Sequence, residues 1–146
     1  MRDIKDDLKF GKNAEKEVKP ILEDVFGKLN ETDSFNNFDF SNDNYYVEHK
    51  QRNIPFGQYD SLYFDKVKYN RYIELKKENA QLRCFIVWSC LNGRYVWEFK
   101  DQFNGNDACF YTYTQKNQDR GKGYLQNTEM VSVFNENITP LEDFKL

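Results

Sequence analysis

The sequence predicts an α/β or, more narrowly, α+β protein in which a mixed central β-sheet is flanked by helices. Three observations support this class. Residues 12–29 carry apolar side chains at helical spacing, residues 38–52 read as two short strands around a polar turn, and an Asn-Gly hairpin turn at 92–93 separates two apolar stretches. Alternating helical and strand-like segments predict helices packed on a sheet. The 146 residues fit one domain, residues 1–146, with a single core.

The first predicted helix, residues 12–29, has one apolar face and one unusual acid. Its apolar face is formed by Val18, Ile21, Leu22, Val25, Phe26 and Leu29. Pro20 lies inside this pattern, so we expect either a bend or a helix that starts close to residue 19. Glu15 projects near the apolar face, where a carboxylate needs a partner. The alternative is an ordinary first-turn glutamate stabilised by the helix dipole.

A second helix is predicted from Asp60 or Ser61, either of which can cap it, to about Ala80. It follows a loop, residues 53–60, that contains a proline and a glycine. Basic residues of this helix slightly outnumber the acids, which indicates a surface for phosphate groups. The candidate nucleic-acid-binding residues are Arg52, Lys66, Lys68 and Arg71. The alternative is a solvated amphipathic helix without a ligand.

The rest of the chain is predicted to form strands. Residues 83–90 are apolar on both faces, which is typical of a central strand covered on each side. Residues 94–99 return antiparallel after the Asn-Gly turn, and Trp88 and Trp97 are expected to fill the core. The tail adds two further strands, residues 108–114 and 129–134.

Residues 38–52 carry the most informative pattern of polar side chains. Asp39 lies in the first short strand, and Glu48-x-Lys50 lies in the second. Side chains alternate along a strand, so Glu48 and Lys50 share one face while Val47 and His49 point to the other. Two carboxylates that face one pocket repel each other and lose hydration unless a cation is present. The pattern therefore predicts a divalent-metal site with an ammonium group beside it to position a water.

The order of Asp39, Glu48 and Lys50 resembles the signature of the PD-(D/E)xK nuclease superfamily, in which an acid ends one strand and (D/E)-x-K lies on the next. Phe38 stands at the position of the usual proline. The resemblance covers roughly residues 10–100. It implies a restriction-endonuclease-like core and a small restriction-endonuclease-like or Holliday-junction-resolvase-like nuclease that uses Mg²⁺ or Mn²⁺ to hydrolyse phosphodiester bonds.

The resemblance also implies a role for each residue. Asp39 and Glu48 would hold one or two metal ions, with the backbone carbonyl of His49 as a further ligand. Lys50 would orient the attacking water or stabilise the transition state, and Glu15 would be a second-metal or supporting ligand. By the same analogy, the substrate is DNA rather than RNA, the attack is endonucleolytic, and the enzyme is a candidate homodimer.

Composition limits the other possibilities. A net charge of −3 argues against a protein that holds nucleic acid by bulk electrostatics alone. Three cysteines without CxxC spacing argue against zinc and indicate a reducing compartment. Without an apolar run of membrane length or a signal peptide, we expect no membrane association and a soluble, intracellular protein, cytoplasmic or within a host cell. The high content of Asn, Lys, Tyr and Phe is typical of an AT-rich genome such as that of a virus or phage.

Two other interpretations stay open at this point. The first is a non-catalytic nucleic-acid-binding module on the same scaffold. The second is an aromatic-rich protein-interaction module, in which the motif is accidental and Asp39 lies far from Glu48. His49 is the only histidine, and without another histidine or a cysteine at ligand spacing we expect a structural role for it.

Overall fold

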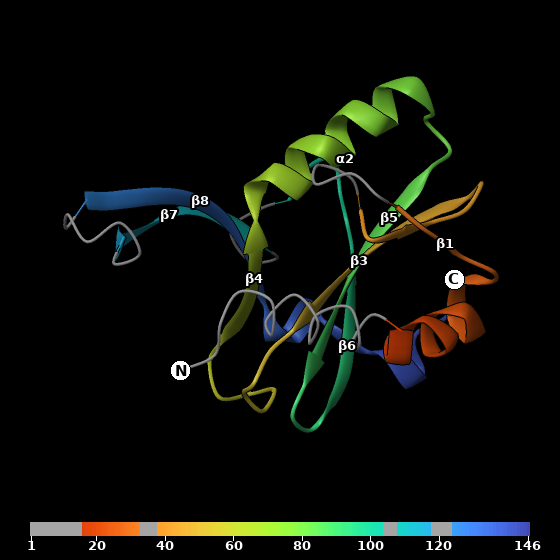
Figure 1. Ribbon diagram of the computed structural model, residues 1–146, viewed down its shortest axis with the longest axis horizontal. Helices are drawn as coiled ribbons and strands as arrows, with labels where there is room; N and C mark the ends of the chain where they lie inside the picture. Colours follow the sequence, from red (N-terminus) through yellow and green to blue (C-terminus); the bar gives the residue numbers. More distant parts are fainter. Residues whose placement is uncertain (1–15, 33–37, 104–107, 118–123) are drawn as a thin grey trace.

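The computed structural model describes residues 16–32, 38–103, 108–117 and 124–146 (Figure 1). This part of the chain contains two α-helices, a mixed six-stranded sheet and an antiparallel three-stranded sheet, so the predicted α+β class is confirmed. No helix in the same ranges is long and apolar enough to cross a membrane.

The six-stranded sheet has the strand order β1-β2-β3-β5-β6-β9. These strands are β1 (Asn30–Glu31), β2 (Phe40–Ser41), β3 (Tyr45–Gln51), β5 (Arg83–Cys90), β6 (Gly93–Glu98) and β9 (Thr139–Pro140). β3 pairs antiparallel with β2 and parallel with β5, and β5 pairs antiparallel with β6. β3 and β5 are therefore interior strands that are hydrogen-bonded on both sides.

The second sheet has the order β4-β8-β7, with β4 at Ser61–Asp65, β7 at Ala108–Asn117 and β8 at Tyr124–Phe134. Both tail strands were predicted, but they are longer than residues 108–114 and 129–134. The two strands pair from Ala108–Val133 to Asn117–Tyr124. Backbone hydrogen bonds between them therefore extend each strand to the polar residues next to the turn. Beyond the end of β4 they extend as a two-stranded arm (Figure 1). Two short 3₁₀ helices follow, η1 (Asn135–Asn137) and η2 (Leu141–Asp143).

The first helix is described over residues 16–26. It runs through Pro20, so a start at residue 19 is wrong. Its end was predicted at Leu29, but Gly27 stops it at residue 26. Gly27 has φ 82°, a left-handed conformation that glycine adopts readily, and its N–H donates to the carbonyl of Glu23 at 3.0 Å. Leu29 is nevertheless buried, just after the helix.

The second helix, α2, spans Lys66–Glu78, so the predicted start at residue 60 or 61 is wrong. Residues 61–65 form β4 instead, because Leu62 and Phe64 alternate into the core and the strand pairs with β8 far along the chain. Asp65 is the true N-cap. Its carboxylate accepts a hydrogen bond from the backbone N–H of Val67 at 2.9 Å.

The predicted hairpin at residues 38–52 is confirmed as β2 and β3. Asn42 holds its turn, because its Oδ1 accepts hydrogen bonds from the N–H groups of Asn44 and Tyr45 at 2.9 and 2.8 Å. Asp39 lies immediately before β2 rather than within it. The Asn-Gly hairpin is also confirmed, with β6 starting at Gly93.

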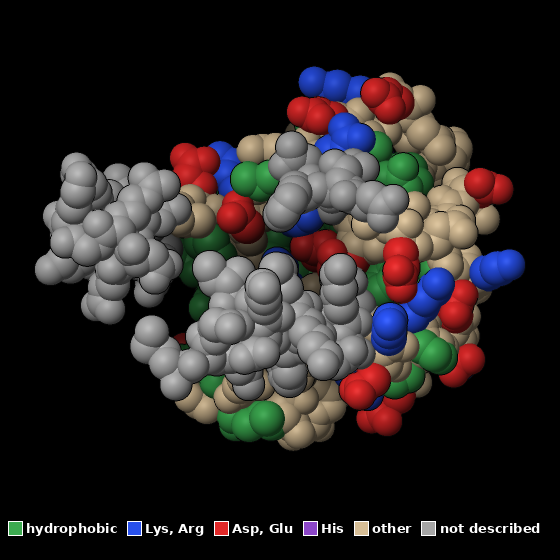
Figure 2. Space-filling model, viewed as in Figure 1, with side chains coloured by type: hydrophobic (Ala, Val, Ile, Leu, Met, Phe, Trp, Pro, Cys, Tyr) green, Lys and Arg blue, Asp and Glu red, His purple; other side chains and the backbone are tan. Residues whose placement is uncertain are grey.

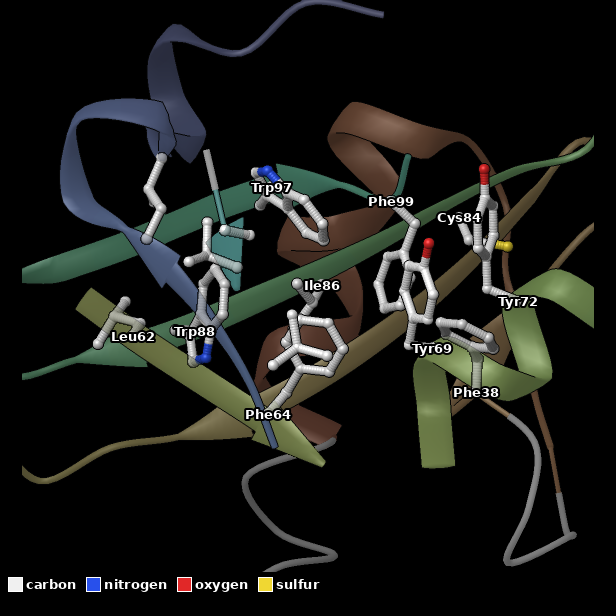
Figure 3. Packing of buried hydrophobic residues seen from close by; sticks show 14 of the residues in the cluster. Phe38, Leu62, Phe64, Tyr69, Tyr72, Cys84, Ile86, Trp88, Trp97 and Phe99 are labelled. Carbon is white, nitrogen blue, oxygen red and sulfur yellow. The ribbon is translucent and has the colours of Figure 1, made fainter. Parts of the chain in front are cut away.

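Two groups of buried apolar side chains cover the two faces of the large sheet. The first helix covers one face, where helix, sheet and η2 side chains form one cluster: Val18, Leu22, Phe26, Leu29, Phe40, Val47, Phe85, Val87, Val96 and Leu141. β4, β8 and α2 cover the other face, where Phe64 packs against Trp88, Trp97 and Phe99 (Figure 3). Trp88 and Trp97 are buried, as predicted.

Candidate functional site

An acid–lysine cluster, formed by Asp39, Glu48, Lys50 and Lys68, lies on the α2 side of the large sheet. Glu48 belongs to the interior strand β3, and its side chain is only 2% exposed. Lys50 follows on the same face, and its Nζ lies 3.5 Å from Glu48 Oε2. The predicted alternation along β3 is confirmed by these contacts, because Val47 packs with the first helix on the opposite face.

Asp39 is joined to β3 by two hydrogen bonds. Its Oδ2 accepts from the backbone N–H of His49 at 2.9 Å, and its own backbone N–H donates to Glu48 Oε1 at 3.2 Å. The turn before β2 therefore presents a carboxylate and an amide to the strand that carries Glu48. Asp39 and Glu48 share one location, and the interpretation that places them far apart is wrong.

Lys68, from the first turns of α2, completes the cluster. Its Nζ lies 3.4 Å from Glu48 Oε2, and its side chain is 12% exposed. Residues 38–52 could not have revealed this contact, because it depends on how α2 is packed. The available signal was Asp65: a cap at that position starts the helix at Lys66 and places Lys68 near the end of β4. Two ammonium groups, rather than a metal ion alone, therefore offset the charge of Glu48.

Burial dominates the electrostatics of Glu48. Loss of hydration, followed by the nearby Asp39 carboxylate, raises the pKa of Glu48 to about 7, although Lys50 and Lys68 act in the opposite direction. At neutral pH this carboxyl group is thus divided between its protonated and charged forms. A perturbed carboxyl group beside two amines is typical of sites that bind or transform a charged ligand.

The other predicted residues lie in different surroundings. Glu15 is outside the described residues, so its role stays a prediction. Lys66 pairs with Glu129 at 3.3 Å, and Arg71 pairs with Glu74 at 3.1 Å. Arg52 donates to the carbonyl oxygen of Tyr63 at 3.2 Å. On the face shown in Figure 2, acidic and basic side chains are interspersed.

His49 points to the opposite face of the sheet. Its Nε2 lies 2.8 Å from Ser89 Oγ, and burial lowers the pKa of the imidazole to about 4. Both groups line a small polar cleft of about 290 Å³, together with Glu17 and Arg94. A neutral, buried imidazole that is hydrogen-bonded to a serine fits the structural role predicted for His49.

The cluster offers a metal ion two carboxylate ligands, those of Asp39 and Glu48. Within the described ranges, no group of three or more His, Cys, Asp or Glu side chains is arranged to hold a metal ion. Two carboxylates are nevertheless compatible with Mg²⁺, which commonly takes one or two from the protein and completes its shell with waters and substrate phosphates. The donor atoms present thus suit a hard, partly hydrated cation and do not suit zinc.

The fold and the cluster together define an α+β protein in which buried Glu48 on an interior strand meets the Asp39 carboxylate and two lysines, Lys50 on the same strand and Lys68 on α2. Comparison of the chain with protein-family models, curated proteins and solved structures finds no significant match.

Proposed function

We propose that this protein is a metal-dependent nuclease that hydrolyses phosphodiester bonds. Its substrate in this proposal is DNA, which it cleaves endonucleolytically. One observation carries the proposal: Asp39 and Glu48 lie together on one side of an interior strand, with Lys50 Nζ 3.5 Å from Glu48. This is the set of groups that the resemblance to PD-(D/E)xK nucleases requires, and all three come from the residues that carry that resemblance.

The order of elements gives further support. A helix precedes the short strands β1 and β2, β3 carries the Glu-x-Lys pair, and α2 leads into β5, which lies parallel to β3. The first helix and α2 pack on opposite faces of the large sheet. This arrangement agrees with a restriction-endonuclease-like core, a mixed sheet with helices on both sides.

In the proposed reaction, Asp39 and Glu48 would hold Mg²⁺ or Mn²⁺. The ion would supply a water of lowered pKa and offset the negative charge that develops on the phosphate. The hydrogen bond from the His49 N–H fixes one oxygen of Asp39, and the Asp39 N–H fixes one oxygen of Glu48, so the carboxylates are oriented before any ligand arrives.

The two lysines have separate tasks in this scheme. Lys50 is 31% exposed, so its ammonium group can contact solvent and a phosphate while it remains beside Glu48, which suits it to position the attacking water. Lys68 is more deeply buried and acts as a positioning residue, because it holds the charged form of Glu48 that a cation needs.

The direct test is cleavage of supercoiled plasmid DNA by the purified protein with Mg²⁺ or Mn²⁺, and with EDTA as the metal-free control. We expect nicked or linear product only with metal. Lys50→Ala should abolish cleavage, while Lys77→Ala, which removes an exposed lysine of α2, should leave it unchanged. A folded Lys50→Ala variant that cleaves at the wild-type rate would refute the assignment.

A second candidate is a non-catalytic nucleic-acid-binding or protein-interaction module. The observation in its favour is that the Glu48 oxygens are already engaged by the Asp39 N–H, Lys50 and Lys68. Calorimetric titration with Mn²⁺ separates the two functions. The nuclease should bind the ion through a site that Asp39→Ala removes, whereas a module of this kind needs no ion.

A further inference from the structure

A pocket of about 450 Å³ lies where the chain leaves β3 and enters β4. Arg52 and Ile54 line it from the β3 side, and Tyr59, Leu62 and Tyr63 line it from the β4 side. Its volume is in the range of small-molecule sites, and its walls combine aromatic, aliphatic and cationic groups.

Arg52 links this pocket to the acid–lysine cluster. The hydrogen bond from its backbone N–H to the carbonyl of Ser89, at 2.9 Å, continues the pairing of β3 with β5. Alternation therefore places Arg52 on the same face as Glu48 and Lys50. Its Cα is about 7 Å from that of Lys50 along an extended chain. Arg52, which lines the pocket, thus follows Glu48 and Lys50 of the cluster along the same face of the β3 chain.

The side chain of Arg52 is held in place by contacts with Tyr63. Its guanidinium lies over the ring of Tyr63, 5.0 Å from the centroid, and it donates to the Tyr63 carbonyl oxygen at 3.2 Å. Trp88 Nε1 donates to the same oxygen at 3.2 Å, which fixes the backbone of β4. Among the described residues, Arg52 Nε is buried and has no hydrogen-bond partner.

Two tyrosine rings are exposed at this pocket. Tyr59 is 59% exposed and Tyr63 is 45% exposed, although neighbouring Leu62 and Phe64 are buried. Aromatic rings beside an arginine are the usual platform for nucleic-acid bases, because every base has a flat face that can stack. A base inside a duplex is already stacked on its neighbours, so only an unpaired base can enter such a pocket.

We infer that this pocket takes one unpaired base of the nucleic-acid chain whose backbone passes Lys50. The base stacks on the exposed tyrosines, and the guanidinium of Arg52, which lines the pocket, donates to the base edge or to an adjacent phosphate. The inference rests on the proposed function, because it takes the acid–lysine cluster as the phosphodiester site. It adds a substrate class: single strands, or duplexes with an unpaired nucleotide near the cleaved bond.

The experiment is a fluorescence-anisotropy titration in EDTA, where no cleavage occurs. The probes are a short labelled oligothymidylate, the same strand with abasic residues throughout, and a duplex of equal length. We expect the oligothymidylate to bind more tightly than either of the others. Tyr63→Ala should weaken its binding by about 5- to 150-fold, the range that corresponds to one base–aromatic stack. Tyr63→Phe, which keeps the ring, should bind as the wild type does.

The abasic strand and a matched variant decide the outcome. Tyr63→Ala should leave binding of the abasic strand unchanged, because no base is there to stack. Phe110→Ala removes an equally exposed ring, 48% exposed with Lys66 over it at 4.9 Å, and should keep wild-type affinity. If Tyr63→Ala unfolds, Tyr59→Ala takes its place. The inference would be overturned if the tyrosine variant lost affinity equally for the oligothymidylate and the abasic strand, or lost no affinity for either.

This result is separate from the plasmid test. Absence of cleavage of both the plasmid and the labelled oligothymidylate in Mg²⁺ and Mn²⁺ would refute the nuclease, while base-dependent binding in EDTA could still be observed. Conversely, cleavage that depends on Lys50, combined with equal affinity of both strands for the protein, would refute the base pocket alone.

Discussion

The burial of Glu48 makes a quantitative prediction for stability. Its pKa is raised from the ordinary value of 4.5 to about 7. Because the folded-state pKa is the higher one, the protonated carboxyl group stabilises the fold fully below pH 4.5, and that contribution is lost as pH rises through about 7. The difference of about 2.5 pKa units corresponds to ~3 kcal/mol in the free energy of unfolding.

The perturbation is Glu48→Gln, which keeps an acceptor for the Asp39 N–H but cannot ionise. In EDTA, raising the pH from 4.5 to 8 should lower the free energy of unfolding of the wild type by ~3 kcal/mol more than that of the variant. At pH 8 the glutamine therefore gains relative to glutamate, although it leaves Lys50 and Lys68 without their carboxylate partner.

Urea unfolding followed by tryptophan fluorescence measures this change, because Trp88 and Trp97 are buried in the folded protein. Glu74→Gln is the matched control. It removes a carboxylate that is 64% exposed and paired only at the surface with Arg71, and such pairs contribute little. If the wild type and Glu48→Gln lose the same free energy between the two pH values, the reasoning about burial is refuted.

Substitutions at three further positions test the packing and the site. Phe64→Ala should lower the free energy of unfolding by about 3–5 kcal/mol, since Phe64 is fully buried against Trp88, Trp97 and Phe99; a loss below about 1 kcal/mol in urea unfolding would contradict this core. Asp65→Ala should cost about 1 kcal/mol and Asp65→Asn much less, because either polar side chain can accept from the Val67 N–H; equal losses would exclude the cap. Lys68→Ala should weaken Mn²⁺ binding measured by calorimetry, whereas the unchanged affinity of such a variant would show that Lys68 does not support the charged form of Glu48.

The local features of the fold could be predicted from the sequence. The hairpin of β2 and β3 depends on a polar turn and alternating side chains, and Asp39 and Glu48 are only nine positions apart. Strand periodicity alone therefore indicated that Glu48 and Lys50 share a face with the acid nearby. The Asn-Gly turn similarly determined the pairing of β5 with β6.

The remaining features depend on contacts between distant parts of the chain. Ser61 hydrogen-bonds to Ser132, 71 residues away, and this pairing turns residues 61–65 into a strand instead of a helix. The position of Lys68 follows from that same pairing, because it sets where α2 begins. The second amine of the cluster was therefore assigned to phosphate contact from sequence, although the structure places it on Glu48.

The parallel pairing of β3 with β5 has a consequence for how the protein folds. The hairpin that brings Asp39 to Glu48 is local and can close within microseconds, whereas Lys68 reaches Glu48 only after the crossover through β4 and α2 has docked. Early in folding the two acids thus meet with Lys50 as their local amine partner, and Lys68 arrives only later.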